Sequence, residues 1–478
     1  MGALIGIDIG TTKICILAIE ETSCEVVACA THASGSVSCP ENGAVEQNVI
    51  EIRNTTFRLL RDIASELAAK DFSVSSIGVT GQMHGVLLVD QHGDPVTDLL
   101  NWQDKRGNDI FANTGRTYAD EVALRLGDER LYRSGTKPAT GYGAVTLFRL
   151  AANSAIPQGV KALTIHDYLV SLLCGKAITD PTDAASWGIL DVTTCTDWLT
   201  DCAEVLNIPT PLLPQIQPTG TIAGNLLPEI ASAIGLPEGI PVAVALGDNQ
   251  ASYIGSVPAL HESILLNLGT GGQMSVATGV FSRPDELEIR PLVNGTWLLV
   301  GASLCGGRAF KILADFFATV GRDIFGLTDI PLLYPTMTRL ASTISDAGDV
   351  SFLPLFAGKR SAPMATAQVS GLCEDNFTAA HLTRSLIAGM VDELLDYYQI
   401  AVASGAAPTV AAGSGNAFRQ NDVIYQEMQR KLGLPFYLPP LHEEAAVGAA
   451  LVGGVAAGVY TNWQEASRSL YQRQAIMP

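Results

Sequence analysis

Two glycine-centred hairpins, far apart along the chain, constrain the fold more than any other feature. Leu4 to Ile19 and Ile264 to Ala277 each consist of two apolar runs around a short glycine- and threonine-rich turn. Apolar runs on both sides of a tight glycine turn predict an antiparallel hairpin. Aligning the two segments places Asp8 on Asn267, Gly10 on Gly269 and Thr11 on Thr270.

A second pair of segments repeats this correspondence. Ser75 to Gln82 and Thr409 to Asn416 both read as a strand that runs into a glycine turn. Two halves with the same opening hairpin and the same later strand indicate an internal duplication. We therefore expect two domains, residues 1–246 and 247–478, with a ligand in the cleft between them.

Helical patterns lie between these strands. Apolar spacing predicts helices over residues 51–70 and 379–404, and Asn421 or Asp422 can cap a helix that ends at Leu432. Residues 445–458 are dense in alanine and glycine and are expected to pack very closely on a neighbour. Alternating strands and helices indicate the α/β class. The domain boundary is expected just after an apolar strand over residues 241–246.

Composition narrows the kind of protein. The 478 residues carry 29 Lys and Arg against 48 Asp and Glu, a net charge of −19. Such an acidic surface repels phosphate backbones and anionic lipid, so we expect neither nucleic acid nor a membrane as partner. The nine cysteines show no Cys-x-x-Cys spacing. This pattern is typical of a reducing compartment, and we expect a cytoplasmic protein.

The first hairpin turn carries groups that suit a phosphate. Gly10 allows close approach, and the hydroxyls and N–H groups of Thr11 and Thr12 can surround an anion. Asp8 ends a strand beside them, where its carboxylate can hold hydrated Mg²⁺. A plain hairpin turn explains the same residues. The second copy, which contains Gly269 and Thr270, favours two turns that bind one polyphosphate.

Asp248 follows an apolar strand and a glycine. A partly desolvated carboxylate at the end of a buried strand can serve as the general base for an alcohol. The alternative is that Asp248 only caps the next helix.

Other polar turns suggest ligand contacts. Gln82 and His84 follow a strand and can bond hydroxyls, while Trp102, Asp104 and Arg106 lie just downstream. A structural histidine and a core tryptophan are the alternatives. The turn from Gly413 to Asn416 can lie against an adenine or ribose, or can be an ordinary loop. His166, Asp167 and Cys305 are predicted to be structural, and Trp187 could either line a pocket or pack in the core.

Taken together and in order, these motifs resemble the FGGY carbohydrate kinase family over residues 3 to 455. The resemblance rests on seven motifs: Asp8 to Thr12, Gly81 to Gly85, Trp102 to Arg106, Gly247-Asp248, Asn267 to Thr270, Phe352 to Arg360 and Gly413 to Asn416. It implies two actin-like (ribonuclease-H-like) domains with an interdomain cleft. The N-terminal domain would bind the sugar and the C-terminal domain ATP.

The resemblance also implies roles for matching residues. Asp248 matches the catalytic base, and Asp8 matches the residue associated with Mg²⁺. The implied sugar contacts are Gln82, Met83, His84, Trp102, Asp104 and Asn249. The implied nucleotide contacts are Thr11, Thr12, Gly269, Thr270, Gly413, Ser414 and Asn416. One departure is Lys359, where the family usually has Glu, with no acidic residue over 364–368.

Within the family, several stretches between Thr140 and Gly188 resemble the sedoheptulokinase subgroup. This similarity implies ATP-dependent phosphorylation of a ketose, sedoheptulose to sedoheptulose 7-phosphate. Xylulokinase and a non-catalytic, sugar-binding actin-like ATPase are the alternatives. The sequence leaves the exact sugar, the regulation and the oligomeric state open, and a homodimer is compatible with it.

Overall fold

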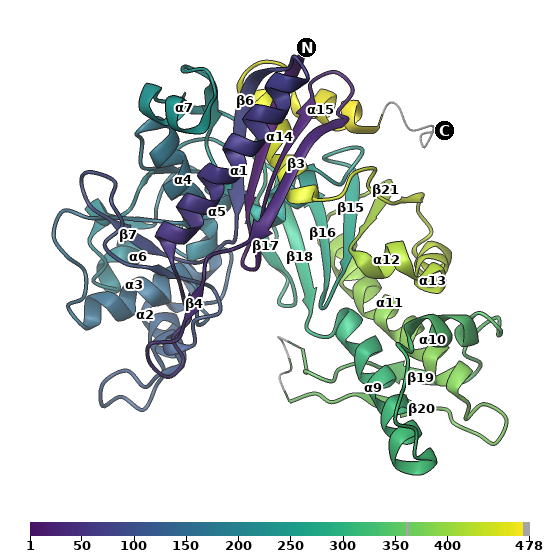
Figure 1. The fold of residues 1–478 in the computed structure, drawn as a ribbon. Helices are drawn as coiled ribbons and strands as arrows, with labels where there is room; N and C mark the ends of the chain where they lie inside the picture. The colour runs from purple at the N-terminus through teal and green to yellow at the C-terminus, as the bar shows by residue number, and fades with distance from the viewer. Residues whose placement is uncertain (360–361, 363, 472–478) are drawn as a thin grey trace. The chain divides into compact units, whose positions relative to one another are not determined.

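The computed structural model describes residues 1–359, 362 and 364–471 (Figure 1). The chain divides into two compact units. Unit 1 comprises Met1–Leu260, Ile289–Trp297 and Pro440–Pro478, and unit 2 comprises His261–Glu288 and Leu298–Pro439. The units therefore change at Leu260/His261, and the C-terminal segment packs with the first unit. The domain boundary expected between residues 246 and 247 was placed from the sequence repeat, whereas the units are defined by contacts in the folded chain.

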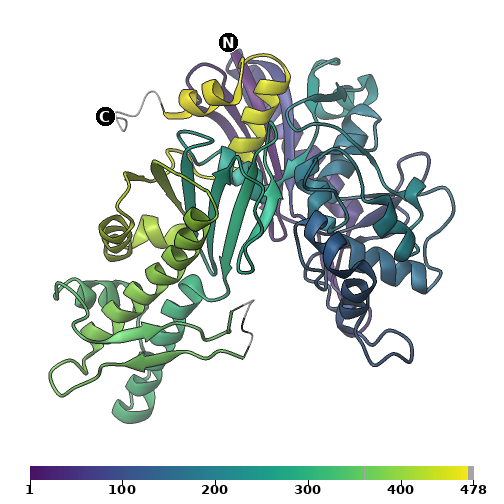
Figure 2. The ribbon, with the colours of Figure 1, turned by 180° about the vertical axis from the view of Figure 1, so that it is seen from behind.

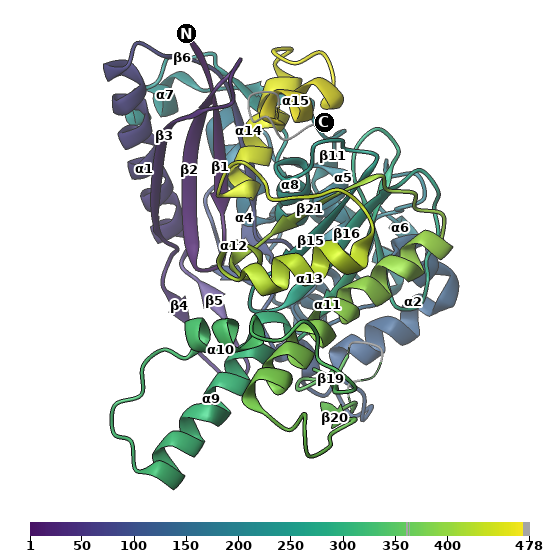
Figure 3. The ribbon, with the colours of Figure 1, turned by 90° about the vertical axis from the view of Figure 1, so that its right-hand side faces the viewer.

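Unit 1 is built on a seven-stranded mixed sheet in the order β12-β13-β6-β1-β2-β3, with β14 paired to β6. β1 is antiparallel to β2 and parallel to β6. The strands are β1 Gly2–Ile9, β2 Lys13–Glu20, β3 Val26–Ala33, β6 Ser73–Gly81, β12 Ile222–Asn225, β13 Pro241–Ala243 and β14 Leu246–Gly247. Figure 3 shows β3, β2 and β1 side by side.

Unit 1 also contains helices, some of which pack on this sheet. The helices are α1 Val49–Ala69, α2 Tyr118–Ser134, α3 Gly143–Ala152, α4 Ile165–Cys174, α5 Pro181–Ala184, α6 Thr200–Val205, α7 Pro228–Ile234, α8 Asp248–Ile254, α14 Glu444–Ala456 and α15 Trp463–Tyr471. Ile5 and Ile7 of β1 pack in one core with Leu60 and Ile63 of α1. Because side chains alternate along a strand, Gly6 faces the other side, against α14.

Glycines allow α14 to approach the sheet very closely. A Cβ on Gly6 would lie 1.9 Å from the carbonyl oxygen of Ala446, and one on Gly78 would lie 1.8 Å from that of Ala449. Gly6 and Gly78 are register partners on β1 and β6. The alanine- and glycine-rich segment thus packs as closely as the sequence predicts. Among the described residues, no helix is long and apolar enough to span a membrane.

Short strands and 3-10 turns complete unit 1. The strands are β4 Val37–Ser38, β5 Glu46–Gln47, β7 Leu87–Val89, β8 Leu99–Leu100, β9 Lys161–Leu163, β10 Ile178–Thr179 and β11 Gln215–Ile216. The turns are η1 Arg106–Asn108, η2 Ala185–Trp187 and η3 Thr210–Leu212. Trp187 is buried in a second core cluster with Phe148 of α3.

Unit 2 contains strands of a second mixed sheet, whose order is β17-β18-β16-β15-β21-β22. The strands are β15 Ser263–Leu268, β16 Gly272–Thr278, β17 Glu288–Pro291, β18 Trp297–Ser303, β21 Val410–Ser414 and β22 Phe436–Tyr437. The helices are α9 Gly306–Phe325, α10 Tyr334–Ala341, α11 Ala379–Ala403, α12 Asn416–Gln420 and α13 Asp422–Leu432, and β19 Ser351–Leu353 pairs with β20 Gln368–Ser370. Figure 2 shows α11 running beside the sheet of this unit.

Strand registers support the internal duplication. In unit 1, β1 is antiparallel to β2 and parallel to β6, so that Asp8 lies opposite Thr80. In unit 2, β15 is antiparallel to β16 and parallel to β21, so that Asn267 lies opposite Ser414. The sequence alignment pairs these same positions, which means that the repeat extends to the hydrogen-bonding pattern.

Local predictions agree closely with the elements found. The predicted helices correspond to α1, α11, α13 and α14, and Asn421 caps α13 by accepting from the N–H groups of Val423 and Ile424. The strand expected over residues 241–246 is interrupted. It forms two short strands, β13 and β14, because Val244 N–H donates instead to the carbonyl of Thr221.

Candidate active site

Asp248 lies at the junction between a strand and a helix in unit 1. β14 ends at Gly247, and Asp248 is the first residue of α8. Gly247 occupies the N-cap position, and α8 has no side-chain cap. Asp248 therefore does not cap the helix, which the sequence left open as its alternative role.

The environment of Asp248 is weakly solvated. Burial raises the pKa of Asp248 to about 6, against the favourable charges of His166 and Arg290. A carboxylate of this kind is ionised at neutral pH and still basic enough to accept a proton from a hydroxyl.

Asp8 lies at the end of β1 with its charge poorly compensated. Burial, Asp248 and Glu443 together raise the pKa of Asp8 to about 7, while Lys13 and His166 lower it. Lys13 Nζ lies 2.6 Å from both carboxylate oxygens of Glu443. Asp8 Oδ1 is buried and has no hydrogen-bond partner in the part of the chain that the structure describes.

Mg²⁺ fits this position chemically. A buried carboxylate oxygen without a donor, next to a second carboxylate, is stabilised by a hard cation. Within the described residues, no group of three or more His, Cys, Asp or Glu side chains is arranged to hold a metal. Asp8 would thus hold a largely hydrated ion, and magnesium remains a prediction.

The turn after β6 presents His84 in a fixed orientation. Its φ of 74° lies in the left-handed region, which costs energy for a residue other than glycine and is typical of functional turns. The ring stacks on Tyr142 with centroids 4.2 Å apart. Nδ1 lies 2.7 Å from the carbonyl oxygen of Ser186, so Nδ1 carries the proton and Nε2 is the acceptor nitrogen.

Met83 connects this turn to Asp248. A Cβ on Gly247 would lie 2.7 Å from Met83 Cε, so the buried Met83 packs directly on the residue before Asp248. Asn249 is also buried, and its side-chain oxygen accepts from Arg290. The structure brings Met83, Asp248 and Asn249 into one region, and their contact with a sugar remains a prediction.

A buried amide that sequence reasoning missed links the two candidate turns. Gln47 donates to the carbonyl of Thr11 and accepts from Gln82. The Thr11 hydroxyl in turn donates to Gln82 and accepts from Trp102 Nε1. Thr11 was predicted to contact the nucleotide, and Gln82 and Trp102 the sugar. In the structure all three belong to one hydrogen-bond network. Thr12 is exposed beside them. Gln47 reaches this position because β5 pairs with both β4 and β8, so no local signal revealed it.

Asp104 is held tightly by its neighbours. Its carboxylate accepts from the Arg106 guanidinium and from the backbone N–H of Val45. Arg106 also forms ion pairs with Glu41 and Glu46. Asp104 thus anchors the Trp102 segment, and its expected contact with a sugar remains a prediction.

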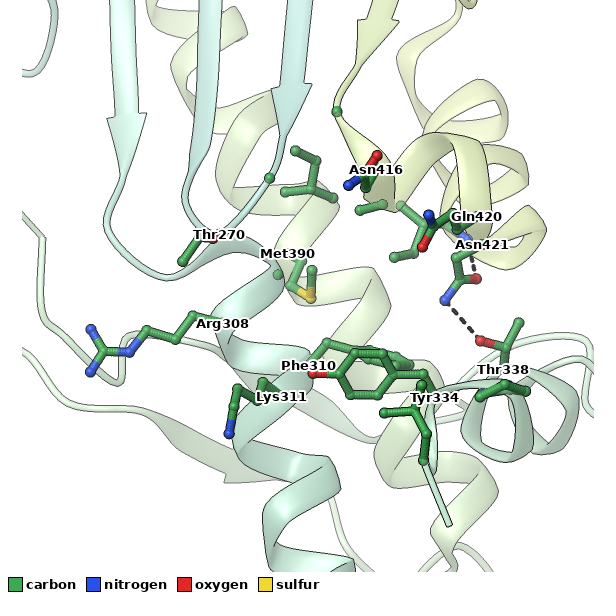
Figure 4. Close-up of a pocket in the computed structure, with 18 of the residues that line it drawn as sticks. Thr270, Arg308, Phe310, Lys311, Tyr334, Thr338, Met390, Asn416, Gln420 and Asn421 are labelled. Carbon is green, nitrogen blue, oxygen red and sulfur yellow. Dashed lines mark hydrogen bonds between the residues drawn. The ribbon is translucent and has the colours of Figure 1, made fainter. Parts of the chain in front are cut away.

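Unit 2 contains a cavity of about 1060 Å³ (Figure 4). One wall is aromatic and apolar: Phe310 and Tyr334 meet edge to face with centroids 5.5 Å apart, and Met390 lies nearby. The opposite wall carries the amides Asn416, Gln420 and Asn421. Asn421 also donates to Thr338 Oγ1 at 3.0 Å. An apolar wall facing amides suits a planar base.

The other end of this cavity suits an anion. The turn with Gly269 and Thr270 abuts the start of α9, where Gly307 and Arg308 donate to its carbonyls. Arg308 and Lys311 of α9 line the cavity. Arg308, close to the N-terminal end of this helix of 20 residues, favours phosphate, whereas Lys311 lies farther along the helix and pairs with Asp315 at 2.6 Å. Basic residues directly after Gly306-Gly307 were the sequence signal that could have revealed this wall.

The predicted nucleotide contacts of unit 2 fall into two groups, one that lines the cavity and one that does not. Gly269, Thr270 and Asn416 line the cavity together with Gly415; their contact with a nucleotide remains a prediction. Gly413 and Ser414 belong to β21 and are absent from its lining. A Cβ on Gly413 would lie 2.3 Å from Phe436, so this glycine serves packing. Direct contact of Gly413 and Ser414 with a nucleotide remains a prediction.

The segment around Lys359 is only partly described. Arg360, which ends the family motif, lies outside the described residues. Lys359 forms a bridge with Ala362. Its charge acts on two acidic residues of α11, lowering the pKa of Glu393 and Asp396 against the larger effect of burial, which raises both. Acidic partners for Lys359 thus come from a distant helix.

Comparison with known proteins matches the chain to one family in two consecutive segments. Residues 3–255 match the N-terminal domain and residues 267–457 the C-terminal domain of the FGGY family of carbohydrate kinases. Sedoheptulokinase of Mus musculus is 30% identical over 94% of this chain and 96% of that protein. Glycerol kinase of Polaromonas naphthalenivorans is 25% identical over 100% of this chain and 95% of that protein.

A solved structure shows the same fold. Xylulose kinase from Rhodospirillum rubrum superposes with a TM-score of 0.86 at 24% identity, covering 98% of this chain and 92% of that one. The expected α/β fold with two actin-like (ribonuclease-H-like) domains is confirmed. With both family domains matched over most of its length, the chain belongs to the FGGY family of carbohydrate kinases and is a phosphotransferase that acts on an alcohol group.

Proposed function

We propose that this kinase phosphorylates a ketose, converting sedoheptulose to sedoheptulose 7-phosphate. The observation that carries the proposal is Asp248, a weakly solvated carboxylate at the start of α8 that packs beside the turn bearing His84. Carbohydrate kinases of this family use ATP as the phosphoryl donor.

In the proposed reaction, unit 1 binds the sugar and unit 2 binds ATP. Asp248 accepts the proton of the attacking hydroxyl, and His84 Nε2 accepts a hydrogen bond from a second hydroxyl. Arg308 and Lys311 neutralise phosphate charge, while Phe310 and Tyr334 hold the base. Mg²⁺ near Asp8 would neutralise the phosphates. Phosphoryl transfer needs this alignment and neutralisation more than covalent help.

The choice of sedoheptulose rests on residues around His84. Tyr142 stacks on the His84 ring, and Ser186 accepts from His84 N–H through its hydroxyl and from the ring through its carbonyl. Both residues belong to the stretches between Thr140 and Gly188 that resemble sedoheptulokinases. The part of the sequence that suggests the substrate is thus the part that orients the candidate sugar turn. The relative at 30% identity is itself a sedoheptulokinase.

Xylulose is the second candidate, because a xylulose kinase shares the fold closely. A site that bonds the extra hydroxyls of a seven-carbon sugar leaves its own polar groups unpaired with a shorter one. We therefore expect kcat/KM to be much higher for sedoheptulose than for xylulose.

The test is an ATP-coupled assay of ADP release with sedoheptulose, xylulose, ribulose, fructose and glycerol. We expect the highest kcat/KM for sedoheptulose. An equal or higher value for xylulose contradicts the substrate but leaves the ketose kinase intact. ADP release that is the same with and without every sugar would favour an actin-like ATPase and contradict the assignment of Asp248.

A further inference from the structure

A buried ion pair lies close enough to Asp248 for both of its charges to act on that carboxylate. His166, in the first turn of α4, has its Nε2 2.9 Å from Asp183 Oδ2, and both side chains are fully buried. Thr164 caps α4 and also donates from its hydroxyl to the same Asp183 oxygen at 2.6 Å. The sequence predicted that His166 and Asp167 were structural, but their partner lies in α5.

α5 is also tied to the residue that precedes Asp248. Gly247 N–H donates to Thr182 Oγ1 at 2.9 Å, and that hydroxyl donates to the carboxylate of Asp180. Asp180 caps α5 by accepting from Asp183 N–H, and it also accepts from Thr219. One short helix therefore holds both the backbone next to the base and the partner of His166.

The charges around His166 are arranged to keep it cationic. Burial alone lowers the pKa of His166, but the carboxylates of Asp183, Asp248 and Asp180 raise it, and the net shift is upward. Asp167, on the same helix, has a pKa well above its ordinary value because it is buried beside Asp183. The Asp183 carboxylate, whose pKa the charge of His166 lowers against the effect of burial, balances His166.

Four charged groups act on Asp248 from the elements around it. His166 of α4 and Arg290 of β17 favour its ionised form, whereas Asp183 of α5 and Asp8 of β1 oppose it. His166 is the larger of the two favourable charges and, being fully buried, is little screened by solvent. Removing it should make Asp248 harder to ionise.

We propose that His166, Asp183 and Thr182 are positioning residues for Asp248: Asp183 holds His166, whose positive charge favours the ionised form of the base, and Thr182 fixes the backbone at Gly247, the residue before it. This inference rests on the proposed role of Asp248 and extends it to three residues that do not touch the substrate. Thr182 acts through geometry and His166 through charge, so their variants should have different signatures.

The first experiment is the pH profile of kcat/KM for His166→Gln, which removes the charge and keeps a polar side chain. We expect the acidic limb to move upward by about one pH unit, with a roughly tenfold loss below it. His166→Lys, which restores a cation, should move the limb back towards that of the wild type. Tyr168→Phe, on the same helix, is the matched control and should leave the limb in place.

Thr182→Val is the companion variant, because valine has nearly the same shape and lacks the hydroxyl. We expect lower kcat, an unchanged KM for ATP and an unmoved acidic limb. A limb that stays in place in His166→Gln, or that moves equally in Tyr168→Phe, overturns the role of the charge. Unchanged kcat in Thr182→Val overturns the role of the tether.

A readout without turnover separates this inference from the proposed function. In ¹⁵N NMR of the histidine rings, the His166 signal should titrate at a higher pH than that of an ordinary histidine, and at a lower pH in Asp183→Asn than in the wild type. A His166 ring that titrates no higher than an ordinary histidine overturns the inference even if the kinase is active. If His166→Gln does not fold, the wild-type and Asp183→Asn spectra still decide. Failure to phosphorylate any sugar would contradict the proposed function, but the titration of His166 would still test whether Asp183 stabilises its charge.

Discussion

At the scale of single residues, Asp248 combines two opposing demands. Its pKa of about 6, against an ordinary 3.8, means that the folded protein disfavours the charged form. Between these values the folded state binds more protons than the unfolded chain, so stability falls as pH rises through this range. Above pH 6, where the base is ionised and active, its burial costs stability. We thus expect the burial of Asp248 to lower the stability of the folded enzyme while it makes the carboxylate basic enough for catalysis.

Asp248→Asn should therefore lose activity and gain stability. Without a general base we expect kcat to fall roughly 10²–10⁴-fold while sugar still binds. The melting temperature at pH 7.5 should rise by a few degrees, because the amide carries no buried charge. Calorimetry at pH 7.5 and pH 4.5 checks this: the gain should shrink at pH 4.5, where the carboxyl of the wild type is protonated. Near-normal kcat would remove Asp248 from the mechanism.

The pH dependence of activity follows from the same residue. As pH falls through about 6, Asp248 becomes protonated and can no longer accept a proton. We expect kcat/KM for the sugar to fall by about tenfold per pH unit well below that value. Steady-state rates between pH 5 and pH 8, with folding monitored by circular dichroism, measure this. A profile that is flat down to pH 5 in folded protein would contradict the raised pKa.

At the scale of elements, the contact between α14 and the sheet of unit 1 depends on glycine. Gly6 and Gly78 lie side by side on β1 and β6, and the backbone of α14 occupies the space that their side chains would need. Backbone atoms cannot yield as a flexible side chain can. This contact also places Glu443, at the N-cap of α14, where it pairs with Lys13 next to the first glycine turn.

Gly78→Ala should consequently destabilise the protein by roughly 2–3 kcal/mol, as overpacking does. Gly279→Ala is the matched control, because no atom lies within 4 Å of the added Cβ and its φ is not left-handed. That variant should change stability by less than about 0.5 kcal/mol. Urea unfolding followed by circular dichroism compares the two. Equal midpoints would show that α14 can move away without cost.

At the scale of the whole molecule, the two candidate ligand sites lie in different units. The residues around His84 and Asp248 belong to unit 1, whereas the cavity with Tyr334 and Arg308 belongs to unit 2. Each unit has its own polar turns. Ligand affinities should therefore respond separately to mutations in each unit.

His84→Ala should raise KM for the sugar about tenfold or more and leave KM for ATP nearly unchanged. Tyr334→Ala should do the reverse, since it removes an aromatic wall of the cavity in unit 2. Initial rates over a grid of sugar and ATP concentrations give both constants for each variant. If either variant weakens both ligands equally, the assignment of one ligand to each unit is wrong.

The sequence by itself determined the features that depend on neighbouring residues. Apolar alternation around Gly10 and Gly269 predicted both hairpins, and helical spacing with the Asn421 cap predicted α1, α11 and α13, because turns, periodicity and caps are local. Aligning the repeats paired Asp8 with Asn267, and the structure shows that these two positions have matching strand registers. Ordered motifs then indicated the family and the position of Asp248.

Only the tertiary structure decided which side chains act together. Gln47 joins Thr11 to Gln82, and Thr182 reaches Gly247 across 65 residues of sequence. His166 resembled a core histidine because its helix is apolar, and its ion pair with Asp183 depends on how α4 and α5 pack. The C-terminal segment joins unit 1 for the same reason. These contacts arise from packing between elements distant in sequence, which composition and periodicity do not encode.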